Sequence, residues 1–282
     1  MMRVAGLALL LLLLPGAKTW SKKHKIGVSL PQRWNLVKTD DGARAFVVEG
    51  PQLGDGSPHL VIWSLGSAGE RTLKQWAENL DGKLRTRAGW KRTAMVDHTV
   101  GPWPAIRMGY GFQEEGKAKG RARVSVVLYG GSIVVFEMSG SARGFPAATF
   151  DRVEKSLEAK WETVALPDKA KAHVPPGWQV MPTPKGMRAA GPRGALVILQ
   201  QGNQPPQGSK PEGTLLFLGE KRAVQTDTRE FKGSAVQLRW VTHAGWEGVI
   251  IMPKDAWAEI GPGARAILAR FELPPPRDGK SD

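Results

Sequence analysis

The chain has 282 residues, of which 41% are hydrophobic and 23% charged, a composition that is ordinary for a globular protein of one or two domains. It contains no cysteine, which excludes disulfide bonds, zinc–thiolate sites and cysteine nucleophiles. With 40 Lys and Arg against 26 Asp and Glu, the net charge is +14, which favours partners that carry negative charge.

The first 17 residues have the pattern of a secretory signal. Arg3 precedes an unbroken apolar run from Val4 to Leu14, and small residues follow up to Ala17. The run is shorter than the ~20 residues that a membrane-spanning helix needs. We therefore predict a signal peptide over 1–17, export to the periplasm or the cell exterior, and a mature chain without a transmembrane segment. An uncleaved N-terminal tether is the alternative.

The first half of the mature chain predicts strands, a helix, more strands and a closing helix. Strand patterns occupy 26–30, 34–37, 44–48, 59–63, 96–100, 106–112, 124–129 and 133–138. Gly130 and Gly131 separate the last two and predict a two-residue hairpin turn. This order predicts an α+β domain, an antiparallel sheet covered by helices.

Two helices are expected in this half. Ser67 and Glu70 have the spacing of a capping box ahead of the first helix. Its apolar stripe consists of Leu73, Trp76, Ala77, Leu80 and Leu84. The closing helix presents Phe150, Val153 and Leu157 on one face.

The second half repeats the first. Pro31 and Trp34 recur as Pro175 and Trp178, 42–45 aligns with 186–189, and 101–108 aligns with 233–240. We predict two tandem domains, 18–165 and 166–275, and a disordered tail over 276–282. In the second copy the stretch GNQPPQGSKPEG stands where the long helix should be, and its prolines and glycines exclude a helix. The second domain therefore lacks the long helix, and we expect it to pack against the first.

The first half, from Ile26 to Glu162, resembles the PsbP-like/DcrB-like fold family. The residues that carry the resemblance are Pro31, Trp34, Leu73, Trp76, Gly101, Pro102, Gly130, Gly131, Phe150, Val153, Ser156 and Leu157. None of them is a candidate residue for catalysis or ligand binding, so the resemblance concerns the fold. It implies an exported or extrinsic accessory protein that binds a larger assembly without catalysis.

A row of cations is the sharpest candidate site. Lys117, Lys119, Arg121 and Arg123 alternate with small residues, so an extended chain puts all four on one face. Such a row can bind phosphates or carboxylates of an anionic lipid or glycan surface, or of an acidic envelope protein. The alternative is a solvated edge strand, where cations discourage pairing with other chains.

Trp103 and Trp246 stand in turn-like contexts, where an exposed indole could stack on a sugar or anchor a partner. The alternative is that both rings fold back onto the core.

The sequence lacks the common motifs of catalytic and metal-binding sites. No serine lies in a nucleophile-elbow pattern, and the five histidines are scattered without ligand spacing. We predict no catalytic, cofactor or metal site and no nucleic-acid partner. The sequence favours an exported, non-catalytic accessory or binding protein of the bacterial envelope. Two alternatives stay open: a hydrolase acting on envelope substrates in an interdomain cleft, and a structural subunit of a larger assembly. Neither the partner nor the oligomeric state follows from the sequence.

Overall fold

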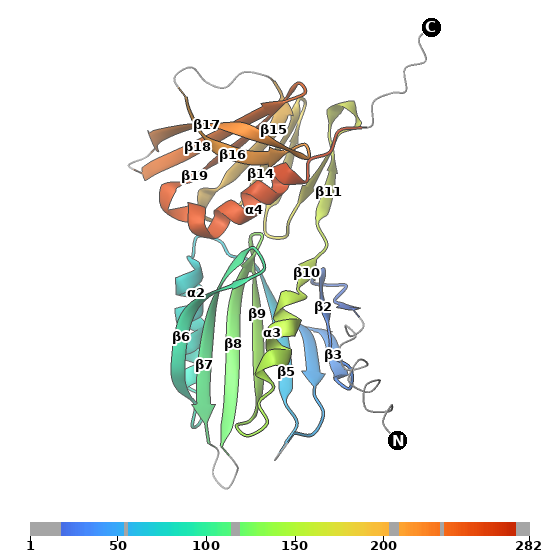
Figure 1. Cartoon of the computed structure of the whole chain (residues 1–282), viewed down its shortest axis with the longest axis vertical. Helices are drawn as coiled ribbons and strands as arrows, with labels where there is room; N and C mark the ends of the chain where they lie inside the picture. The colour runs from blue at the N-terminus through green and yellow to red at the C-terminus, as the bar shows by residue number, and fades with distance from the viewer. Residues whose placement is uncertain (1–17, 54–55, 114–118, 203–208, 232–233, 275–282) are drawn as a thin grey trace, which may run out of the picture. The chain divides into compact units, whose positions relative to one another are not determined.

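The computed structural model describes residues 18–53, 56–113, 119–202, 209–231 and 234–274. The predicted signal peptide, the tail from 276 and Lys117 lie outside the described residues. The chain divides into two compact units (Figure 1). The first comprises residues up to 65, 74–127 and 134–160, and the second comprises 66–73, 128–133 and the chain from 161 onward.

The first unit is built on a seven-stranded antiparallel sheet in the order β3-β4-β5-β9-β8-β7-β6. Its strands are β3 (Asn35–Asp41), β4 (Arg44–Glu49), β5 (His59–Ser67), β6 (Lys91–Val100), β7 (Trp103–Phe112), β8 (Gly120–Tyr129) and β9 (Ser132–Ser141). A small sheet joins β1 (Lys18–Trp20), β2 (Ile26–Ser29) and β10 (Glu158–Ala159). Every strand expected in this half is present, and the β8–β9 hairpin turns at Gly130 and Gly131.

Helices α2 (Leu73–Arg85) and α3 (Ala147–Lys155) pack on opposite faces of this sheet. The Tyr110 hydroxyl in β7 donates to Asp81 of α2, whereas Arg107, an odd number of residues away in the same strand, donates to Glu154 of α3. Neighbouring positions of a strand alternate between faces, so the two helices cover different sides. Phe150 and Val153 of α3 are buried, as their spacing predicts.

The predicted capping box is wrong. Strand β5 continues to Ser67, and α2 begins only at Leu73. The Ser67 hydroxyl instead accepts from the backbone N–H of Gly69, which is a local turn rather than a helix cap.

The second unit repeats the architecture with the strand order β13-β14-β15-β19-β18-β17-β16. These strands are β13 (Gln179–Thr183), β14 (Gly186–Ala190), β15 (Leu196–Gln201), β16 (Lys210–Phe217), β17 (Glu220–Phe231), β18 (Ser234–His243) and β19 (Trp246–Pro253). Helix α4 (Trp257–Ala269) follows the last strand of this sheet. Strands β11 (Glu162–Ala165) and β12 (Lys171–Val174) form a hairpin that precedes β13. The described residues of this unit also form three single 3₁₀ turns, η1 (Pro167–Lys169), η2 (Pro192–Gly194) and η3 (Lys254–Ala256). The described residues between β15 and β16 contain no counterpart of α2, so the second copy lacks the long helix as predicted.

The Pro-x-x-Trp motif, which ends at Trp34 and again at Trp178, has the same packing role in both units. The Trp34 ring lies against Gly50, directly after β4, and the Trp178 ring lies against Gly191, directly after β14. A Cβ at Gly50 would lie 3.0 Å from the ring of Trp34, and one at Gly191 would lie 2.6 Å from the ring of Trp178. Each glycine therefore leaves room for the tryptophan ring to pack against the backbone.

One part of the predicted repeat register is wrong. The stretch 233–240 was expected to match 101–108, which lies at the start of β7, but it lies in β18. In the strand order β18 corresponds to β8, and β17 corresponds to β7. Arg239 therefore corresponds to Ser125, since each lies four residues before the last residue of its strand, which a two-residue turn follows.

No helix among the described residues is long and apolar enough to cross a membrane. The predicted contact between the two domains stays a prediction.

Candidate functional site

Strand β8 carries part of the predicted basic row. Arg121 and Arg123 point to the α3 side of the sheet, while Ala122 and Val124 are buried on the other side. Lys119 precedes the strand and is exposed. The edge-strand alternative is wrong, because β8 lies between β9 and β7 inside the sheet. The cations therefore line the surface of a sheet rather than its rim.

A pocket of about 540 Å³ opens beside these arginines. Its floor includes Gly109 and Gly111 of β7, which have no side chains to fill the space. Arg143, from the segment between β9 and α3, adds a third guanidinium to the lining, with Phe145 beside it. We call Arg121, Arg123 and Arg143 the arginine pocket. Arg143 was not predicted, because nothing in the local sequence ties it to β8.

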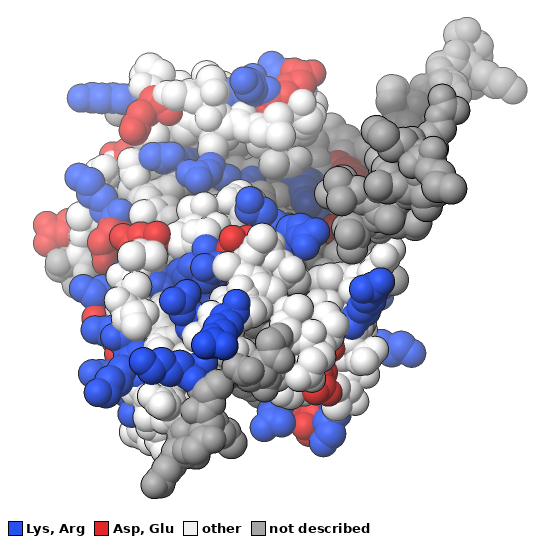
Figure 2. Space-filling model, turned by 60° about the horizontal axis from the view of Figure 1, so that its bottom comes forward, with Lys and Arg blue, Asp and Glu red and all other residues white. Residues whose placement is uncertain are grey.

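The charge of the arginine pocket is only partly compensated. Arg123 donates to Asp151 at 3.1 Å, and its guanidinium lies 5.9 Å from the ring centre of Phe145. Arg121 and Arg143 are exposed and form no ion pair with a described residue. Figure 2 shows the same imbalance on a wider scale, since Lys and Arg outnumber Asp and Glu on the face turned to the viewer. Planar guanidinium groups around a hollow of this size suit a phosphate or a carboxylate.

A polar cluster lies beneath α3, next to the arginine pocket. Glu154 is only 1% exposed and accepts from Arg107, whose guanidinium also lies 3.0 Å from Asp151. His98 Nε2 is 3.7 Å from the same glutamate. Burial raises the pKa of Glu154, and burial together with the charge of Arg107 lowers the pKa of His98. Ser125 is fully buried in this cluster, so no substrate reaches it, and the cluster fastens α3 to the sheet.

The two tryptophans proposed as contact residues are buried. Trp103 is 8% exposed and Trp246 is 3% exposed. The ring of Trp246 packs against Phe271, with 4.9 Å between the ring centres. Exposed indoles at these positions are therefore wrong, and the alternative that both rings fold back onto the core is confirmed, because both side chains start β-strands whose inward positions belong to the core.

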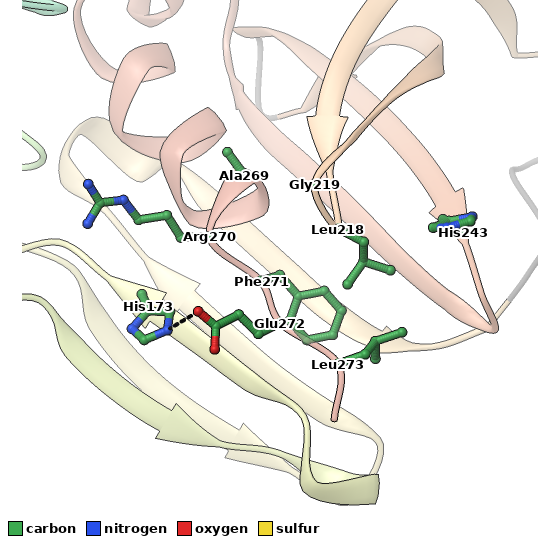
Figure 3. A pocket seen from close by; sticks show the side chains of 9 residues that line it. All are labelled: His173, Leu218, Gly219, His243, Ala269, Arg270, Phe271, Glu272 and Leu273. Atoms are coloured by element: carbon green, nitrogen blue, oxygen red, sulfur yellow. Dashed lines mark ion pairs between the residues drawn. The ribbon is translucent and has the colours of Figure 1, made fainter. Parts of the chain in front are cut away.

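The second unit holds a larger pocket, of about 710 Å³ (Figure 3). It lies beside the end of α4, and its lining residues are His173, Leu218, Gly219, His243, Ala269, Arg270, Phe271, Glu272 and Leu273. His173 Nε2 is 3.2 Å from Glu272 in the pocket, and Nδ1 is 3.2 Å from the Thr163 hydroxyl.

This order of hydroxyl, imidazole and carboxylate resembles a hydrolase relay. However, the Glu272 side chain is 61% exposed, so water competes for the imidazole, and Thr163 lies outside the pocket lining. The backbone of Glu272 pairs with Lys171 of β12. We therefore assign these contacts a structural role, which is to fasten the chain after α4 to the β11–β12 hairpin. The described residues contain no cluster of metal-ligating side chains.

Fold and pocket together define a tandem α+β protein with an arginine-lined pocket. No protein-family model and no curated protein matches the sequence. Solved structures similar to the chain include a cyanobacterial PsbP from Synechocystis sp. PCC 6803, with 13% identity over 51% of this chain and 91% of that one and a TM-score of 0.41. LpqN of Mycobacterium tuberculosis, described as involved in cell envelope biogenesis, has 16% identity over 51% of this chain and 84% of its own, with a TM-score of 0.38. A Bacteroides thetaiotaomicron protein has 19% identity over 57% of this chain and 54% of its own, with a TM-score of 0.39. A PsbP protein is thus among them, as the sequence resemblance predicts.

Proposed function

We propose that this chain is an exported, non-catalytic accessory protein of the bacterial envelope that binds an anionic surface through the arginine pocket. The observation that carries the proposal is the pair of exposed arginines, Arg121 and Arg143, beside a hollow of about 540 Å³. A lipid head group with a phosphate or a carboxylate fits such a space and can accept two parallel hydrogen bonds from one guanidinium. The proposed domain limits are 18–165 and 166–275, with a cleaved signal over 1–17.

Binding to vesicles tests the proposal. The protein that lacks residues 1–17 is titrated with phosphatidylcholine vesicles, with and without phosphatidylglycerol, over a series of salt concentrations. The wild type should bind only the anionic vesicles, and less at high salt. Since each Arg near an anionic surface contributes about 1 kcal/mol, the double variant R121A/R143A should bind roughly thirtyfold more weakly.

The matched control removes two exposed lysines of the same unit, as K22A/K83A. If the arginine pocket is a specific binding site, this control should bind nearly as well as the wild type. An equal loss in both double variants would show attraction by net charge alone and contradict a site. Failure of the wild type to bind either vesicle would contradict the surface and leave an acidic protein as the source of the anion.

A further inference from the structure

The closing helices of the two units carry different charges at matching positions. Asp151 in α3 lies seven residues before Glu158, which pairs with β2, and Arg265 in α4 lies seven residues before Glu272, which pairs with β12. Their partners, Gly27 and Lys171, each lie four residues before the proline of a Pro-x-x-Trp motif, so Asp151 and Arg265 are equivalent. By the same offset, Glu154 corresponds to Leu268.

The strands that face these two helices also differ in charge. Ser125 of β8 corresponds to Arg239 of β18, and the cross-strand partner of Ser125 is Arg107, whereas that of Arg239 is Thr226. In the first unit one arginine is held by two carboxylates. At the equivalent place of the second unit, one arginine approaches another and both carboxylates are gone.

Arg239 and Arg265 both lie near Trp257. The guanidinium of Arg239 lies 4.1 Å from the ring centre of Trp257. Trp257, Gly261 and Arg265 form one stripe of α4, and a Cβ at Gly261 would lie 3.0 Å from the Trp257 ring and 3.6 Å from Arg265 Nη1. Burial, and after it the charge of Arg239, lowers the pKa of Arg265.

Two hydrogen-bond donors of this cluster have no acceptor in the part of the chain that the structure describes. The Nε of Arg239 and the Nε1 of Trp257 are buried without a partner among the described residues. One carboxylate comes near: Glu212 lies 4.0 Å from Arg239 and is 56% exposed. Leaving buried donors unpaired beside two cations is costly unless an anion satisfies them.

We propose that Arg239, Arg265 and Trp257 form a second anion site, which takes a phosphate-sized oxyanion. The two guanidinium groups supply the charge and the indole N–H supplies a further donor. The source of the oxyanion is free inorganic phosphate or a phosphate monoester. This site lies within the second unit and does not depend on the arginine pocket.

The test isolates this site by using the R121A/R143A protein without residues 1–17 as the parent. Its titration with sodium phosphate is followed by calorimetry and by thermal unfolding, against sodium chloride of equal ionic strength. The parent should bind phosphate saturably and unfold at a higher temperature in it than in chloride. R265Q should bind at least about tenfold more weakly. The matched control R188Q removes an exposed arginine of the same unit and should bind within about twofold of the parent.

A third variant separates loss of phosphate binding from loss of folding. R265D places next to Arg239 the carboxylate that the first unit has at this position, so it should unfold at a higher temperature than the parent without phosphate, yet bind no phosphate. Equal binding by R265Q and R188Q, or a response of the parent to phosphate no larger than to chloride, would overturn the proposal. Phosphate titration in the R121A/R143A background and vesicle binding by the wild type are scored separately, so either site can fail alone.

Discussion

Replacing Arg107 by methionine should cost the first unit about 3–5 kcal/mol of unfolding free energy at pH 7. Glu154 is almost wholly buried, and its Oε1 has no hydrogen-bond partner among the described residues, so its charge depends on the guanidinium at Oε2. Methionine fills much of the volume of Arg107 but leaves the carboxylate without its cation. Removing one member of a buried pair exposes the full cost of desolvating the other.

The loss should depend on pH in a definite direction. Burial raises the pKa of Glu154 in the folded protein above its unfolded value of about 4.3. Stability from such a group is fully present below the unfolded pKa and is lost as the pH rises through the folded pKa. Without Arg107 the folded pKa rises further, so the variant should approach the wild type near pH 4 and fall behind it toward pH 7.

Urea unfolding followed by circular dichroism at both pH values measures these differences. The double variant R107M/E154L is the control, because the second unit has Leu268 at the position of Glu154. It should recover most of the loss, since a buried ion pair replaced by apolar side chains is often neutral. A cost of R107M below about 1 kcal/mol at pH 7, or one that is equal at pH 4 and pH 7, would refute a buried, charged Glu154.

Two further changes test the first unit. Burial, assisted by the hydrogen bond to Asp81, raises the pKa of Tyr110, so the wild type should lose stability as the pH rises above about 10, the unfolded value. The variant Y110F should lack this loss and should cost about 1 kcal/mol of unfolding free energy at pH 7. Parallel pH profiles of the two proteins in urea unfolding would contradict this prediction. G82A should stabilise the protein by about 0.5–1 kcal/mol, because a Cβ there meets nothing within 4 Å in the interior of α2. G89A should destabilise it, because its Cβ would lie 2.5 Å from the Gln113 carbonyl oxygen at a positive φ; equal thermal unfolding of both glycine variants would contradict the reasoning.

The strands and the closing helices were predictable because each has one buried face with a clear period. Phe150 and Val153, for example, are spaced for a helix and are both fully buried. The helix start at Ser67 was predicted wrongly, since a serine followed by a glutamate also occurs where a strand ends in a turn. The repeat register was wrong beyond the first strands, because glycine and arginine recur in several strands and only the pairing order separates them.

Two of the three arginines in the arginine pocket could be predicted, and the third could not. Arg121 and Arg123 share a face by the alternation of a strand, which needs only their spacing. Arg143 arrives from a segment beyond the next strand, and that approach depends on how α3 docks. The burial of Trp103 and Trp246 depends likewise on which face of each strand meets a helix, and turn-like neighbours carry no information about that.

The use of one strand order twice in a chain creates a hazard during folding. Tandem copies of a fold can exchange strands while both are unfolded, and such misassembly is typical of repeat proteins. Here the copies carry incompatible side chains. If β8 entered the second sheet, Ser125 would replace Arg239 beneath α4; if β18 entered the first, Arg239 would face Arg107. The second exchange would set two arginines beside each other in the first sheet, so the divergence of charge between the two copies disfavours it.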